Sequence, residues 1–402
     1  MRRVTVQNRR HALMRRHHLA ADADSPEAVV QALIGLHASD PASVYLSVLA
    51  RSATATLSDV AAAMYERRSL VRWLAMRRTL FVFSCDDIPV VQAAVSTAIA
   101  ETLRRRLVTQ LRRNGTEPPV DGDAVGWLAS VEAGVEDALR RRGAATGVEL
   151  AGDEPGLRTR ILARTASERP HNLTTPLLTL MSAEGRLVRS TPTGAWTSRQ
   201  HRWEPVRSWW PDGLATVDPD QARRELARRW LARFGPARVD DLQWWTGWSA
   251  GTSRRALEHL AVEDVDLHGH RGIDLADGDA DLGYATTQEP VAALLPALDP
   301  TPMGWKHREW FLGIDPGHLF DRAGNIGPTL WWNAEIIGSW AITAHGDLRW
   351  KIIADRGAQA RDAIEQAAAR LHGRLHGAVI TPAIRVPLER SLSTRGDPPA
   401  RA

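Results

Sequence analysis

The chain has 402 residues, 44% of them hydrophobic and 24% charged, which is the balance of a globular protein with room for about two to four compact units. No apolar run approaches the length of a membrane-spanning helix or a secretory signal, and Cys85 is the single cysteine, so an internal disulfide is ruled out and we expect a cytoplasmic protein. The formal net charge of +4 is too small to indicate nucleic-acid binding by itself.

Two helices with a short polar connection are expected near the N-terminus. Apolar residues recur at helical spacing over residues 26–36 and again after Pro41. Asp40 followed by Pro41 marks the start of the second helix, because aspartate caps helices and proline favours the first helical position. His37 and Ser39 therefore lie at an elbow between two helices, where side chains can converge on a cleft.

Helices followed by a pair of strands make up the rest of the first part, which is the order found in a winged helix. The predicted helices cover residues 6–19, 57–66 and 87–112, and the predicted strands cover residues 70–74 and 79–83. The two strands are joined by a turn at residues 76–78, and we expect Arg77 and Arg78 in this turn to contact DNA. Residues 113–122 contain Gly and Pro and are the clearest linker.

A similar unit repeats after this linker. We predict helices over residues 124–140, from 148 onward and over 174–184, and strands at 185–189 and 195–197. The continuation over residues 198–203 interleaves basic residues with an aromatic one. This pattern fits a second DNA-contacting wing with Arg199, Arg202 and Trp203 as its contacts. It fits equally well a solvated strand with the tryptophan packed beneath it.

The last third of the chain changes from helices to strands. We predict helices over residues 221–234, 239–246, 253–260 and 358–375, short strands from about 265, and a strand pair or barrel segment between 331 and 353. The segment His268-Gly269-His270 is a weak metal candidate, because a turn before a strand explains it better. The polar residues after 392 are expected to be disordered.

Several motifs along the chain carry a family resemblance. Gly-Leu-His-Ala-Ser-Asp-Pro at residues 35–41, followed by Tyr-Leu-Ser-Val-Leu-Ala-Arg at 45–51, resembles the first-domain signature of the AlkZ/YcaQ-type winged-helix DNA glycosylases. Residues 234–242 resemble the third winged helix of that family. Residues 295–305 and 321–331 resemble segments of its C-terminal domain. The motifs are specific in combination, and the resemblance covers nearly the whole chain.

The resemblance implies an α+β fold with three tandem winged-helix domains followed by a C-terminal β-rich, barrel-like domain. The implied domains are a first winged helix with the catalytic elbow (1–113), a second (124–211), a third (219–264), the β-rich domain (265–392) and a disordered tail (393–402).

The resemblance also implies the chemistry of the elbow. The family hydrolyses the N-glycosidic bond of alkylated bases, mainly purines substituted at N7, and such a base already carries positive charge and leaves without protonation. His37 and Ser39 occupy the positions of the family's catalytic pair, which usually contains glutamine. A neutral imidazole, which ordinarily titrates near pH ~6.5, can accept a proton from water. Ser39 would hold the same water through its hydroxyl.

The function implied is monofunctional excision of N7-alkylated guanine, with bulky natural-product adducts or crosslinks as substrates and self-protection of an antibiotic producer as the role. The partner is double-stranded DNA carrying alkylated purines, and we expect a monomer with no membrane association. A water nucleophile is favoured because a Schiff base needs an amine and the only lysines are Lys306 and Lys351. The alternative is a non-catalytic winged-helix protein that binds DNA or regulates.

Three further residues are candidates for accessory roles. For Asp40, a role as a helix cap is favoured over a part in catalysis. Asp299 fits a tight turn beside Pro300 better than a place in the cleft wall, and for Asn325 both interpretations stay open. No phosphate-binding loop, metalloprotease motif or nucleophile elbow occurs in the sequence, so no cofactor or metal is expected.

Overall fold

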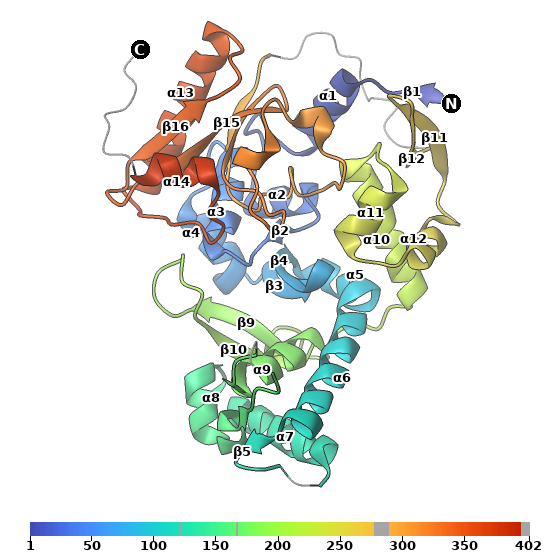
Figure 1. Ribbon diagram of the computed structural model, residues 1–402, viewed down its shortest axis with the longest axis vertical. Coiled ribbons are helices and arrows are strands. Elements are labelled where there is room, and N and C mark those ends of the chain that lie inside the picture. Colours follow the sequence, from blue (N-terminus) through green and yellow to red (C-terminus); the bar gives the residue numbers. More distant parts are fainter. Residues whose placement is uncertain (121, 166–167, 277–288, 395–402) are drawn as a thin grey trace. The chain divides into compact units, whose positions relative to one another are not determined.

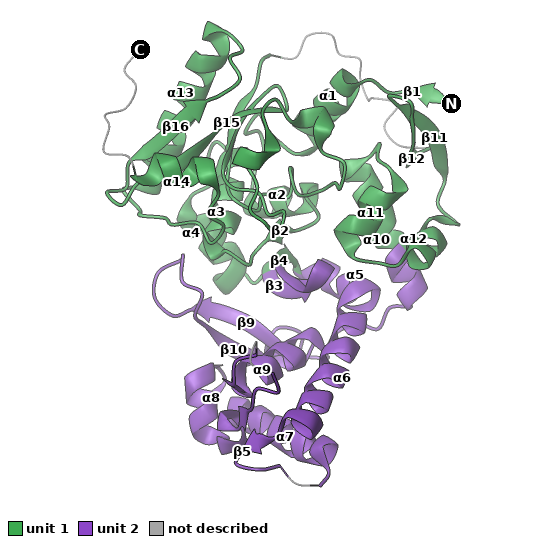
Figure 2. Cartoon of the chain, viewed as in Figure 1, with its two compact units in different colours: residues 1–70, 81–84, 224–402 green, residues 71–80, 85–223 purple. Residues whose placement is uncertain are grey.

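The computed structural model describes residues 1–402 except 121, 166–167, 277–288 and 395–402. The described residues form a mixed fold of helices and several sheets (Figure 1). They divide into two compact units (Figure 2). Unit 1 contains residues 1–70, 81–84 and 224–402, and unit 2 contains residues 71–80 and 85–223.

Unit 1 begins with short helices whose starts follow the capping residues seen in the sequence. The helices are α1 (Val6–Arg16), α2 (Pro26–Ala32), α3 (Pro41–Arg51) and α4 (Leu57–Ala61), the last continued by a π-helical turn at Ala62–Glu66. Ser25 caps α2 and Asp40 caps α3, each through a side-chain oxygen, with proline at the first helical position. The start of α3 is therefore confirmed as predicted.

The segment before α3 differs from the prediction. Helix α2 ends four residues early, and Leu36–His37 form a short strand, β2, that pairs antiparallel with β4 (Thr79–Ser84). The helix cannot continue because Ile34 has a positive φ of 65°, outside the helical region. The elbow is thus a helix, a two-residue strand and a helix.

The later part of unit 1 is made of helices and of strands that belong to two sheets. The helices are α10 (Pro219–Phe234, in unit 1 from residue 224), α11 (Val239–Thr246), α12 (Ala250–Leu257), α13 (Ala358–Leu375) and α14 (Pro387–Thr394). The strands are β1 (Arg2–Arg3), β11 (Val262–Leu267), β12 (His270–Leu275), β13 (Ala292–Leu295), β14 (Thr329–Trp332), β15 (Glu335–Ile342) and β16 (Leu348–Ile352). Strand β1 joins the β11–β12 hairpin in parallel to β11.

The barrel-like arrangement expected for residues 265–392 is not formed by the described residues of this range. Strands β13, β14, β15 and β16 form an open antiparallel sheet in that order, and β13 does not pair with β16. Helices α13 and α14 pack against this sheet, as Figure 1 shows, so they cover apolar surface that closure would otherwise bury. Helix α14 also occupies residues 393–394 of the expected disordered tail, whose remaining residues 395–402 lie outside the described residues.

Unit 2 contains helices where the sequence predicted them, together with the short strands β5, β6, β7 and β8, which it did not predict. Its helices are α5 (Ile88–Val91), α6 (Thr97–Asn114), α7 (Ala124–Arg142), α8 (Gly147–Asp153) and α9 (Thr174–Ala183). Its strands are β3 (Leu70–Ala75, from residue 71), β5 (Thr116–Glu117), β6 (Ala145–Thr146), β7 (Arg160–Ile161), β8 (His171–Asn172), β9 (Leu187–Pro192) and β10 (His201–Pro205). The predicted strand at 195–197 is wrong, because β9 is followed by a longer loop and then pairs with β10.

A buried polar network holds α1 and α3 to the later part of unit 1. His17, fully buried after α1, has Nδ1 2.9 Å from Thr301 Oγ1 and Nε2 3.1 Å from the carbonyl oxygen of Arg233. Arg51 of α3 donates to Thr301 Oγ1 at 2.7 Å and to both carboxylate oxygens of Asp299 at 2.8 and 2.7 Å. Segments about 250 residues apart in sequence are thereby fixed to one another, which sets the position of α3 and the elbow before it.

The stability of the protein should fall in acid because of His17. Burial, together with the charge of Arg51, lowers the pKa of His17 well below its usual range. Below pH ~6.5 the unfolded chain takes up a proton at this residue that the native chain refuses, so the free energy of unfolding decreases by up to about 1.4 kcal/mol per pH unit. Urea unfolding of the wild type and of His17→Gln at neutral and acid pH measures the difference. Equal pH slopes for both proteins would contradict it.

Candidate active site

The elbow is held against β4 by a close backbone approach. A Cβ added at Gly35 would lie 2.7 Å from Phe83 Cε1 and 3.1 Å from the carbonyl oxygen of Val82, so only glycine allows this contact without displacement. Ile34, just before it, is buried with a φ that branched side chains rarely adopt. Such strain persists where the surroundings fix the backbone, and it is frequent at functional sites.

His37 is nearly enclosed at the edge of this strand pair. Its side chain is 5% exposed, and its ring lies against that of Phe81, its pairing partner on β4, with centroids 4.9 Å apart. Its Nδ1 accepts a long hydrogen bond, 3.5 Å, from the backbone N–H of Ser39. A neutral imidazole that accepts at Nδ1 carries its proton on Nε2. The basic nitrogen therefore lies on the side of the ring that meets Ser39.

Ser39 and Asp40 differ in surroundings although they are neighbours. Ser39 is exposed, whereas Asp40 is buried. Asp40 Oδ1 accepts from the N–H of Ala42 at 3.3 Å, and Oδ2 accepts from the N–H of Ala383 at 2.7 Å. Both oxygens are thus occupied by backbone donors, which fits the interpretation of Asp40 as a helix cap.

The other accessory candidates lie in structural contacts as well. Asp299 is fully buried and pairs with Arg51 through both oxygens, and it also accepts from Ser47 Oγ at 2.9 Å. Asn325 closes a loop, because its Nδ2 donates to Asp321 Oδ2 at 3.0 Å and its backbone N–H to Asp321 Oδ1 at 2.9 Å. Asp299 fixes more than the tight turn that was expected, since its ion pair anchors α3.

The segments around these residues agree with a known family. The family described as DNA glycosylase AlkZ-like has a model that matches residues 30–373, which include the elbow, the Asp299 loop and the Asn325 loop. The chain belongs to the AlkZ-like DNA glycosylase family. Membership supports a role as a DNA glycosylase, and hence DNA as the substrate.

A solved structure agrees with the family at the level of the fold. The Streptomyces sahachiroi DNA glycosylase AlkZ superposes with a TM-score of 0.67 and 18% sequence identity, over 92% of this chain and 97% of that chain. At this identity the likeness concerns the fold alone. No curated protein matches the chain.

The arginines expected to touch DNA lie in unit 2 of this AlkZ-like protein. Arg77 and Arg78 form the turn between β3 and β4 and both have positive φ, 53° and 61°, with Arg78 exposed and Arg77 half-buried. Arg199 is exposed, whereas Arg202 lies 3.2 Å from Glu149 in an ion pair and donates to the carbonyl oxygen of Ala144 at 2.8 Å. Arg78 and Arg199 are thus the more accessible of the four.

Trp203 is packed inside unit 2, as predicted by the interpretation of residues 198–203 as a solvated strand with its tryptophan buried. It is a residue of β10, is 6% exposed and belongs to the apolar core of unit 2. Its ring is covered by the guanidinium of Arg189, 4.6 Å from the ring centroid. A tryptophan in this position stabilises the unit and offers little surface to a duplex.

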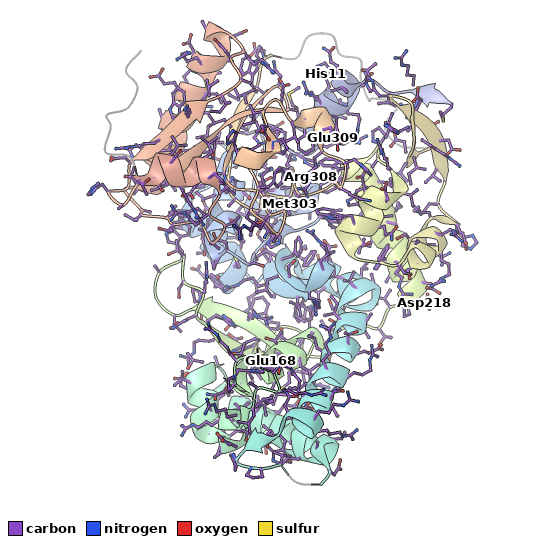
Figure 3. All side chains as sticks on the ribbon, viewed as in Figure 1. His11, Glu168, Asp218, Met303, Arg308 and Glu309 are labelled. Atoms are coloured by element: carbon purple, nitrogen blue, oxygen red, sulfur yellow. The ribbon has the colours of Figure 1, made fainter. Side chains whose placement is uncertain are left out.

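His268 and Lys306, the residues weighed and not favoured as a metal ligand and a Schiff-base amine, have protein partners. His268 lies in the β11–β12 turn, where its Nε2 accepts from the N–H of Val6 at 3.0 Å. Lys306 has its Nζ 3.2 Å from Asp240 Oδ2. It belongs to the segment of the chain between Met303 and Arg308, the two residues of this segment's ends that Figure 3 labels. Among the described residues, no group of three or more His, Cys, Asp or Glu side chains is arranged to hold a metal ion. In the same part of the chain, no helix is both long and apolar enough to cross a bilayer.

Phe81 is the site residue that the sequence analysis missed. It was expected only as part of a strand, yet its ring contacts His37. Phe81 and Phe83 are two positions apart on β4, and their rings stack with centroids 5.8 Å apart. The alternation of the strand indicated an apolar face, but not that this face covers the histidine.

Proposed function

We propose that this protein is a monofunctional DNA glycosylase that hydrolyses the N-glycosidic bond of N7-alkylated guanine in double-stranded DNA. Bulky natural-product adducts and crosslinks are the proposed substrates, and self-protection of an antibiotic producer is the proposed role. The observation that carries the proposal is the pairing of an enclosed imidazole with an exposed hydroxyl two residues away, inside the segment that matches the family.

The reaction needs little acid catalysis. A guanine alkylated at N7 is already cationic, so the bond to the sugar breaks without protonation of the base. The protein must place a water next to C1′ and accept its proton while the sugar becomes cationic. We assign proton acceptance to Nδ1 of His37, whose single lone pair would exchange its long hydrogen bond from the N–H of Ser39 for one from the water. We assign orientation of the water to Oγ of Ser39. The proposal is tested by incubating the protein with duplex DNA that contains N7-methylguanine. The free base should be released and an abasic site should remain in the strand.

The grip on DNA is proposed to come from three winged-helix units, at residues 1–113, 124–211 and 219–264. Arginines in the turns of the first two, among them Arg78 and Arg199, would contact phosphates and supply affinity that does not depend on sequence. The role of the β-rich part, residues 265–392, would be to support the elbow through the Asp299–Arg51 pair. We propose a monomer.

Replacing Ser39 with alanine should slow base release by about 2- to 10-fold. A single hydrogen bond that orients water contributes about 0.5–1.5 kcal/mol, and an exposed side chain can be replaced without disturbing the core. Single-turnover rates of the wild type and Ser39→Ala measure the effect, with Ser391→Ala as an unrelated serine control. An unchanged rate for Ser39→Ala would remove Ser39 from the reaction.

No covalent complex with DNA should form under reducing conditions. A bifunctional enzyme forms a Schiff base through an amine, which borohydride traps. Lys306 is paired with Asp240, and Lys351 is exposed on β16. Denaturing gels after borohydride treatment should show free protein only, next to a bifunctional glycosylase that is trapped in parallel. A trapped band from this protein would overturn water as the nucleophile.

The second candidate function is a non-catalytic DNA-binding or regulatory protein. The low exposure of His37 favours this alternative, because an enclosed imidazole can serve to hold the elbow against Phe81. Binding of alkylated duplex without release of any free base would support it over the glycosylase.

A further inference from the structure

Unit 2 contains a cavity of about 830 Å³ that plays no part in the chemistry proposed for the elbow. Residues of α8, of the first turns of α9, and of strands β9 and β10 line it. Its volume lies in the range of pockets that hold small organic ligands. All of its lining residues belong to unit 2, whereas His37 belongs to unit 1.

The lining of this cavity is basic. Arg158, Arg189 and Arg199 contribute to it, and none of the described residues that line it is aspartate or glutamate. Glu149 of α8 is already engaged, since it accepts from the N–H of Thr146 at 2.7 Å and pairs with Arg202 at 3.2 Å. The hydroxyls of Thr175 and Thr179 on α9 add neutral donors to the lining. Those of Thr146, Thr174 and Thr193 already donate to protein oxygens. The cavity therefore suits an anion.

Arg189 is the most informative residue of the lining. It is 5% exposed, and its Nη1 donates to the neutral hydroxyl of Ser182 at 2.7 Å. Burial and the neighbouring charge of Arg72 lower the pKa of its guanidinium to about 9, and no carboxylate forms an ion pair with it among the described residues. A buried charge without a counter-ion is costly, and a bound anion would remove that cost.

His201 adds a second group that lacks a partner. Its Nδ1 lies 3.1 Å from the carbonyl oxygen of Arg199 and must donate to it, so in the neutral ring Nε2 is an acceptor. This Nε2 is buried and has no hydrogen-bond partner among the described residues. Burial lowers the pKa of His201 to about 4, so the ring is neutral at physiological pH. The ring therefore adds no positive charge to the lining of the cavity, whose charge comes from the arginines.

We propose that this cavity binds a nucleotide unit, with its phosphate held by Arg189, Arg158 and Arg199 and its sugar and base in the rest of the cavity. Arginine suits phosphate because its planar donors form paired, charge-assisted bonds. The nucleotide can be free or part of a DNA strand, since both present a phosphate, a sugar and a base. The inference does not rest on base excision at His37.

Calorimetric titration of the full-length protein with deoxyadenosine monophosphate tests the site, and deoxyadenosine serves as the ligand without phosphate. The monophosphate should bind at least about 10-fold more tightly, which corresponds to about 1.4 kcal/mol. The double variant Arg158→Gln/Arg199→Gln, in two exposed residues, should weaken it by a similar factor. The matched control Arg106→Gln/Arg113→Gln makes the same charge change at exposed positions of α6 outside the cavity and should bind as the wild type does.

The source of the ligand is distinguished with a tetranucleotide that has internal phosphodiesters and no terminal phosphate. Binding equal to that of the monophosphate identifies a strand within DNA, and much weaker binding identifies a free nucleotide or a phosphorylated strand end. Either result supports the site. Equal binding of monophosphate and nucleoside, absence of binding by the monophosphate, or unchanged affinity in the Arg158/Arg199 variant would overturn it. Because the readout is binding alone, a failure of the glycosylase proposal would leave this result intact.

Discussion

Replacing His37 with alanine should slow release of N7-methylguanine from duplex DNA by about 100- to 10,000-fold, the usual contribution of a positioned base. The loss is expected because no other group is assigned to take the proton of the attacking water. His37→Gln should lose less, since an amide oxygen can hold the water although it cannot take its proton. Single-turnover rates measured by chromatography of the released base would show the order wild type, His37→Gln, His37→Ala.

Two controls separate this effect from a folding defect. His318→Ala removes an exposed histidine of the same unit and should leave the rate unchanged. Thermal unfolding of each variant shows whether the elbow still holds against Phe81. The wild-type rate should also fall towards acid pH, because a protonated imidazole accepts no proton, and the residual rate of His37→Ala should not share that decline. A rate for folded His37→Ala equal to the wild type would rule out His37 as the base.

The second large effect concerns stability. Replacing Asp299 with alanine should lower the free energy of unfolding by about 3–5 kcal/mol, because Arg51 would remain fully buried with no carboxylate partner. Urea unfolding followed by tryptophan fluorescence measures the change. The matched control is Asp137→Ala, which breaks the exposed pair with Arg140 on α7 and should cost less than about 1 kcal/mol.

Asp299→Ala also tests whether Asp299 takes part in chemistry. If its role is to anchor α3, the fraction of this variant that remains folded at low temperature should still release the base, and adding His37→Ala should reduce that release. Similar small losses of stability in Asp299→Ala and Asp137→Ala would contradict the anchoring role.

Local signals in the sequence predicted the elements that depend on local chemistry. Asp40-Pro41 correctly marked the start of α3, and the strands on either side of Met76–Arg78 were predicted to within a residue or two. The helix over residues 358–375 was predicted with its bounds, because its apolar spacing is regular. Capping, turns and periodicity are properties of neighbouring residues, so one sequence suffices to recognise them.

Contacts between distant segments could not be predicted from the sequence. Residues 36–37 form a strand only because β4 lies beside them, and helical spacing alone extended α2 through them. Alternation between 331 and 353 indicated strands, but it cannot show whether the first strand of the sheet pairs with the last. The expected barrel-like closure was therefore not found, and the sheet is open. The motif identified the positions of His37 and Ser39, but their unequal exposure depends on Phe81, a partner about 40 residues away.

Chromatography of a single-turnover reaction between wild-type protein and duplex DNA with one N7-methylguanine tests the central claim most directly. The account predicts free N7-methylguanine together with an unbroken strand that carries an abasic site and breaks only on treatment with alkali. A duplex that is bound in full while its modified base stays attached would contradict it.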